Sequence, residues 1–139
     1  MEIQFRFYRT TIDQQELPSS FFDIRGGLDK VMIGLDWSEV GTKERLLHQL
    51  EKVLGANLSF LDYWHEEVHE QYLEIDIFLK SLKELVTILM DNQDYHQQID
   101  YPYLPNDFLS QGLLEAIQAL INYFDIYRKQ GATVFKMET

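Results

Sequence analysis

Two histidines four positions apart are the residues of this sequence whose types and spacing best fit a chemical role. The run His65-Glu66-Glu67-Val68-His69 has the pattern H-E-x-x-H. On a helix, histidines at i and i+4 project one turn apart on the same side, where they can share a tetrahedral Zn²⁺. The glutamate beside the first histidine can then take a proton from metal-bound water. The pattern therefore indicates metal-assisted hydrolysis.

These five residues resemble the signature of the zincin metallopeptidases. That resemblance implies that His65 and His69 are zinc ligands and that Glu66 is the catalytic general base. A third ligand would have to come from one of four acidic residues elsewhere in the chain, namely Asp91, Asp94, Asp100 or Glu115. The resemblance covers the five residues of the motif only, and a minimal zincin-like hydrolase is one interpretation of them, with a non-catalytic metal site as another.

The flanking residues favour a third interpretation, in which the motif is the solvated flank of a helix. Glu67 and Glu70 stand where the zincin pattern prefers uncharged and apolar residues. Tyr72 and Ile75 replace the glycine and histidine of the metzincin extension. On a helix, a row of acids spaced by four would run beside the histidines: Asp62, Glu66, Glu70 and Glu74. This interpretation predicts no metal and no catalysis.

Strand-like patterns lie at both ends of the chain. Residues 2–9 alternate, with Ile3, Phe5 and Phe7 on one side, which is the period of a half-buried strand. Residues 21–25 and 30–37 flank paired glycines and predict a hairpin. Residues 132–138 follow Gly131 and are rich in β-branched and aromatic residues, which predicts a last strand. The two ends are therefore expected to share one antiparallel sheet.

Helical spacing dominates between the strands. One helix is expected from Thr42, as its cap, to about residue 54, ending at Gly55. The longest is expected from Ser59 to about residue 91, with Ser59 and Asp62 as a capping box and Trp64 on its apolar stripe. Its length also predicts a kink or break. Residues 92–107 predict an irregular connection, and a final helix is expected from near residue 107 to Lys129.

These patterns predict the fold class and the domain organisation together. We expect one α+β domain over residues 1–139, because chains of this length commonly form one domain. Its small antiparallel sheet would combine the N-terminal strands with a C-terminal strand. Three helices, including one long central helix, would cover the sheet.

Composition and net charge indicate which partners and which cell compartment to expect. There are 23 Asp and Glu against 12 Lys and Arg, so the formal charge is −11. That charge repels a phosphate backbone and an anionic membrane surface, which makes nucleic acid and membrane poor partners. The chain has no cysteine, so it has no disulfides and no thiolate metal site. The first residues lack the pattern of a signal peptide, and we expect a cytoplasmic protein.

The negative charge gathers in the middle of the sequence. Residues 59–100 carry 10 acidic and 2 basic residues, a balance of −8. The connection after them is rich in tyrosine, which is favoured at interfaces. We therefore predict a non-catalytic, inhibitor-like or immunity-like module that binds a basic protein, while a lid of tyrosines over the core and a homo-oligomer remain alternatives. The expected contact residues are Glu66, Glu70, Glu74, Tyr95, Tyr101 and Tyr103.

Overall fold

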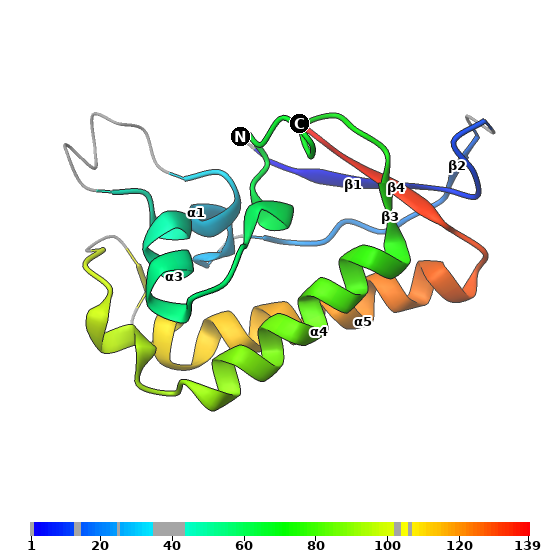
Figure 1. The fold of residues 1–139 in the computed structure, drawn as a ribbon. Coiled ribbons are helices and arrows are strands. Elements are labelled where there is room, and N and C mark those ends of the chain that lie inside the picture. The colour runs from blue at the N-terminus through cyan, green and yellow to red at the C-terminus, as the bar shows by residue number, and fades with distance from the viewer. Residues whose placement is uncertain (1, 13–14, 25, 35–43, 102–103, 106) are drawn as a thin grey trace.

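The chain folds into a four-stranded sheet covered by helices, as Figure 1 shows. The computed structural model describes residues 2–12, 15–24, 26–34, 44–101, 104–105 and 107–139. The strands are β1 (Gln4–Tyr8), β2 (Glu16–Leu17), β3 (Leu73–Glu74) and β4 (Val134–Glu138). The α-helices are α1 (Leu28–Met32), α3 (Leu46–Leu54), α4 (Ile75–Asp91) and α5 (Leu113–Lys129). Three single turns complete the described elements: η1 (Ser59–Leu61), η2 (Tyr95–Gln98) and η3 (Phe108–Gly112), the last with π-helical hydrogen bonding.

The sheet has the order β2-β1-β4-β3, and every neighbouring pair is antiparallel. At its centre β1 pairs along its whole length with β4, from Gln4 opposite Glu138 to Tyr8 opposite Val134. The two edge strands are short, and each pairs through two residues only. The predicted first and last strands are therefore confirmed, and so is the α+β class.

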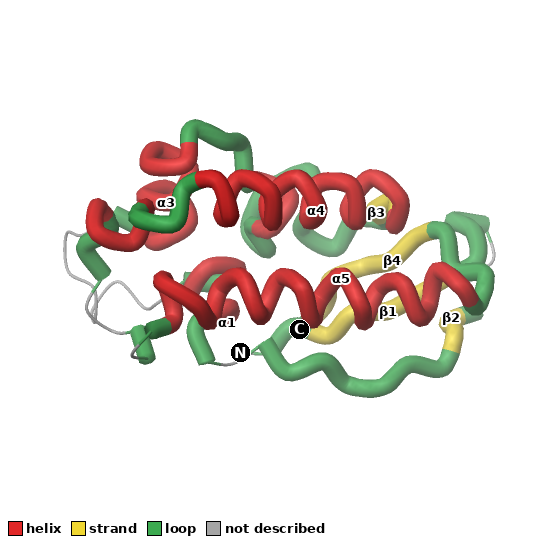
Figure 2. Tube along the Cα trace, turned by 90° about the horizontal axis from the view of Figure 1, so that it is seen from below, coloured by secondary structure: helices red, strands yellow, loops and turns green. Residues whose placement is uncertain are grey.

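Helices α4 and α5 lie side by side across one face of the sheet (Figures 1 and 2). Aromatic side chains fill the space between these layers. Phe5 and Phe7 of β1 meet the ring of Phe124 on α5, with centroids 5.1 Å away in each case. The ring of Tyr127 stacks on Phe7 at 4.3 Å. The alternation of the first strand thus places its apolar side on the core, as its sequence predicted.

The hairpin expected around Gly26 and Gly27 is wrong. Residues 28–32 form helix α1 instead, and no described residue of 21–24 or 28–34 is in a strand. Gly27 has φ 128°, and a Cβ there would lie 2.4 Å from the ring of Phe108, so the position requires glycine. Leu28, Val31 and Met32 are buried at helical spacing. The rest of the expected second strand, residues 35–37, lies outside the described residues.

The long helix expected over residues 59–91 is also wrong in its first half. The turn η1 ends at Leu61, residues 62–72 are irregular, and α4 begins only at Ile75. Asp62 does not close a capping box with Ser59, because its backbone is extended (φ −85°, ψ 105°) and its carboxylate binds a distant arginine. Glu70 has a positive φ of 55°, which no continuous helix accommodates. The expected break is therefore a complete interruption.

The other two predicted helices are confirmed. Helix α3 ends at Gly55, whose left-handed conformation (φ 64°) is the cap that the sequence predicted. The proposed cap residue Thr42 lies outside the described residues. Helix α5 ends with Arg128 and Lys129 in its last turn, as predicted, but the residues before Leu113 form the π-turn η3. In the described part of the chain, no helix has the length and apolar character needed to cross a membrane.

Candidate functional site

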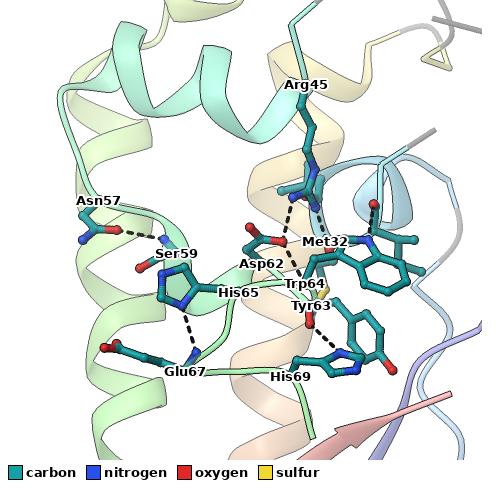
Figure 3. Close-up of polar contacts among 12 residues, drawn as sticks. Met32, Arg45, Asn57, Ser59, Asp62, Tyr63, Trp64, His65, Glu67 and His69 are labelled. Carbon is teal, nitrogen blue, oxygen red and sulfur yellow. Dashed lines mark hydrogen bonds and ion pairs between the residues drawn. The ribbon is translucent and has the colours of Figure 1, made fainter. Parts of the chain in front are cut away.

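The H-E-x-x-H motif lies in the irregular segment between η1 and β3 rather than on a helix, as Figure 3 shows. The backbone makes one turn there: the carbonyl of His65 accepts hydrogen bonds from the N–H groups of Val68 (2.9 Å) and His69 (2.8 Å). The positive φ of Glu70 then ends the turn. The helix that was to present both imidazoles on one side is therefore absent from this segment.

The two imidazoles are held by different partners and do not converge (Figure 3). Nδ1 of His65 accepts the backbone N–H of Glu67 at 3.2 Å. Nδ1 of His69 lies 3.2 Å from the carbonyl oxygen of Tyr63, and it must carry the hydrogen because a carbonyl only accepts. Among the described residues, no three His, Asp or Glu side chains are grouped so that they could hold a metal ion. The geometry that the zincin resemblance implied for His65, Glu66 and His69 is therefore not present.

A partly buried ion pair anchors the start of this segment. Arg45, the N-cap residue of α3, donates from Nη1 to Oδ1 of Asp62 at 2.6 Å. Its Nη2 donates to the carbonyl oxygen of Met32 at 2.8 Å, at the end of α1. The same Asp62 oxygen accepts the backbone N–H of Trp64 at 3.0 Å. Asp62 is thus a structural residue that joins α1, α3 and the motif segment, and it does not belong to an exposed acidic row.

Trp64 combines exposure with a fixed position. The residue is 48% exposed, whereas its neighbour Tyr63 is 1% exposed. The indole Nε1 donates to the carbonyl oxygen of Ile33 at 2.8 Å. The indole also stacks on the ring of His69, with centroids 5.7 Å apart and planes 19° apart. The sequence placed Trp64 on a buried stripe, which is wrong because the segment is not helical.

Four glutamates follow this tryptophan within ten residues of the sequence, and all four side chains are exposed. The segment from Trp64 to Glu74, which we name the acidic turn, contains no lysine or arginine. None of its four glutamates forms an ion pair with a described residue. Glu66, Glu70 and Glu74 do not form the predicted helical row, because they lie in a turn and an edge strand. The four are Glu66, Glu67, Glu70 and Glu74.

The two described tyrosines of the connection after α4, Tyr95 and Tyr101, are folded into the protein. Tyr95 is 5% exposed and its hydroxyl donates to the carbonyl oxygen of Leu109. Burial raises the pKa of Tyr95 to about 12. Tyr101 is 8% exposed, and Tyr103 lies outside the described residues. Tyr95 and Tyr101 therefore occupy the positions that the lid alternative expected, and neither side chain stands on the surface for a partner.

Sequence reasoning missed both the Arg45–Asp62 pair and the exposed position of Trp64. The pair joins residues 17 positions apart, and no local pattern marks either of them. The exposure of Trp64 follows from the irregular backbone. It was missed because the spacing of the apolar residues predicted a helix that would bury Trp64. No protein-family model, curated protein or solved structure matches this chain.

Proposed function

We propose that this protein is a non-catalytic module that binds a basic protein partner through the acidic turn, with Trp64 as the central contact. The observation that carries the proposal is the half-exposed indole of Trp64, fixed by Ile33 and His69 and followed in the sequence by four exposed glutamates that form no ion pair with a described residue. An inhibitor or immunity protein of a cationic enzyme is the class that this surface fits best. We propose the cytoplasm as its compartment.

The tryptophan supplies the affinity in this proposal. Tryptophan is enriched among the few residues that carry most of the binding energy of an interface. An indole that is already fixed loses little conformational freedom when a partner covers it, because the ordering of side chains is one of the costs of association. The hydrogen bond to Ile33 and the stacking on His69 provide that ordering in the free protein.

In this proposal the glutamates select a positively charged partner. Like charges gathered on one surface raise the local potential, which speeds the approach of a partner of opposite charge and discourages others. The net charge of −11 adds to the same field over longer distances. A cationic protein is therefore the partner that these residues would attract.

A fluorescence titration tests this proposal directly. The chain has two tryptophans, so a Trp37→Phe background leaves Trp64 as the only indole. We expect a lysine- and arginine-rich 15-residue peptide to change the Trp64 emission in a saturable way, and an aspartate- and glutamate-rich peptide of equal length to have no effect. The response to the basic peptide should weaken as salt rises from about 0.05 to 0.5 M, because screening shortens the reach of exposed charges.

Two charge-matched variants separate a local site from the overall charge. Glu66→Lys with Glu70→Lys and Glu74→Lys should abolish the response. The control variant changes three acids outside the acidic turn, each exposed, and should retain most of it: Asp91→Lys with Asp94→Lys and Glu115→Lys. Equal loss in both variants would mean that only net charge matters, and the proposed surface would then be wrong.

A further inference from the structure

The edge of β1 opposite to β4 is only half covered. Strand β2 pairs with Phe7 and Tyr8 and then stops, whereas β4 pairs with all five residues of β1. The carbonyl of Tyr8 accepts the N–H of Thr133 on the β4 side at 3.0 Å. Alternate residues of a strand direct their backbone groups to opposite neighbours. The backbone N–H and C=O groups of Phe7 and Phe5 therefore point to the β2 side. No described strand lies beside Phe5 there.

The chain that follows β2 runs alongside β1 without continuing the sheet (Figure 2). Extending the β2 register would place Ser19 opposite Phe5. The next residue, Ser20, binds to helix α5 instead. The hydroxyl of Tyr127 accepts the backbone N–H of Ser20 at 2.8 Å, and the hydroxyl of Tyr123 donates to the carbonyl oxygen of Ser20 at 2.5 Å. Both backbone groups of Ser20 are therefore already bonded to α5 and do not bond to β1.

A groove of about 220 Å³ lies between this segment and β1. Its lining includes Phe5 and Arg6 from the strand, Ser19 and Phe21 from the segment, and Tyr123 from α5. Phe21 is 58% exposed, so part of the lining is an aromatic ring in contact with solvent. The volume is below the usual range for small-molecule pockets, about 300–1,000 Å³, so the groove does not fit an enclosed small-molecule site.

We propose that this groove binds an extended peptide segment of another protein, which pairs with Phe5 of β1 by strand addition. In such complexes the backbone hydrogen bonds give affinity and alternate side chains give specificity. The residue opposite Phe5 would point to the same side as the Phe5 ring, towards Phe22 and Tyr123, whose rings lie 6.2 and 6.1 Å from it. An apolar residue suits that position.

The flanking residues of the peptide should be polar and uncharged. They would point to the outer face of the sheet, where Arg6 already forms ion pairs with Glu16 at 3.0 Å and Glu138 at 2.7 Å. A guanidinium with two carboxylate partners offers little attraction for a further anion. This groove lies at the β2 edge of the sheet, whereas the acidic turn leads into β3 at the opposite edge. The two proposals are therefore independent.

An NMR titration tests strand addition. The probe is the blocked peptide acetyl-Ser-Thr-Val-Thr-Ser-amide, added to the isotope-labelled full chain. We expect saturable amide shifts centred on Phe5, with smaller shifts at Gln4 and Arg6. The matched control peptide carries N-methylvaline at its centre, which removes the one N–H that would bond to the Phe5 carbonyl. It should bind about tenfold more weakly, as loss of one backbone hydrogen bond predicts.

Protein variants check the location. Phe21→Ala should weaken the binding several-fold, while Ile126→Ala, which changes a similarly exposed apolar residue on α5, should not. Equal binding of the two peptides would show apolar contact without strand pairing and would overturn the proposal. Absence of shifts at β1 up to about 10 mM peptide, roughly tenfold above a millimolar dissociation constant, would overturn it as well. Concentration-dependent dimerisation through β1 would assign the groove to a second copy and also contradict it.

Discussion

Arg45 and Asp62 form an ion pair of 2.6 Å that fixes where the acidic turn begins. The two side chains are only 16% and 12% exposed. Arg45 also bonds to the carbonyl of Met32, so one guanidinium connects the end of α1, the start of α3 and the backbone that leads to Trp64. The position of the proposed binding surface thus depends on a partly buried ion pair.

Breaking this pair should destabilise the protein strongly. We expect Asp62→Asn to lower the free energy of unfolding by about 3 kcal/mol, because it leaves the guanidinium of Arg45 partly buried without its counter-charge. Urea denaturation measures this effect. The control is Asp76→Asn, which removes an exposed ion pair with Arg128 and should leave stability nearly unchanged. Similar losses in the two variants would contradict a structural role for Asp62.

Truncation of the neighbouring aromatic residues Tyr63 and Trp64 should cost very different amounts of stability. Tyr63→Ala removes a ring that is 1% exposed and should cost about 3–5 kcal/mol of stability. Trp64→Ala removes a ring that is 48% exposed and should cost about 1 kcal/mol. Leu82→Ala, in the middle of α4, is a reference core substitution and should cost about 2–5 kcal/mol. A larger loss for Trp64→Ala than for Tyr63→Ala would mean that the burial described for this segment is wrong.

Stability should not depend on chelators. A metal that binds only the folded protein raises the melting temperature in proportion to the logarithm of its concentration, so a true site makes unfolding sensitive to EDTA. His65 and His69 do not converge here, and we expect the same melting temperature with EDTA as with one equivalent of zinc. His65→Ala should not alter that comparison. A melting temperature that rises with zinc and returns with EDTA would restore the zincin interpretation.

Alkaline pH should weaken the protein in part through Tyr95. Burial raises the pKa of Tyr95 to about 12, above the value of about 10 for a free tyrosine. Between these values the unfolded chain releases a proton that the folded chain retains, so stability falls as pH rises from about 10 to 12. Tyr95→Phe should flatten that fall, measured by urea denaturation at pH 9 and pH 11.5. A fall of equal slope in both proteins would contradict this assignment.

Local sequence pattern predicted the elements in which periodicity and packing agree. The alternation around Phe5 and Phe7 predicted β1, and the spacing of Ile117, Leu120 and Phe124 predicted α5, because one face of each element is buried. The cap of α3 at Gly55 was also predictable, since a left-handed residue there favours glycine. These features depend on residues that are close together in the sequence.

The candidate site could not be predicted in the same way. Asp62 fits a capping box by spacing, but its actual partner Arg45 lies 17 residues earlier. The apolar residues from Leu61 to Ile75 happen to have the spacing of a helical stripe, which predicts that Trp64 is buried. In the structure Tyr63 is buried and Trp64 is exposed. Paired glycines favour a hairpin in general, yet Gly27 serves here to admit the ring of Phe108. Each error reflects a tertiary contact that overrides a local preference.

The pairing of β1 with β4 also constrains how the protein can form during synthesis. The central ladder of the sheet joins the first strand of the chain to the last, so it cannot close until the ribosome has released residues 134–138. Until then the aromatic side of β1 has no β4 beside it, and Phe135 cannot yet pack against Phe124. Topologies dominated by such distant contacts fold slowly. Deletion of residues 133–139 should therefore prevent the folding of this domain, because it removes the partner of β1 at the centre of the sheet.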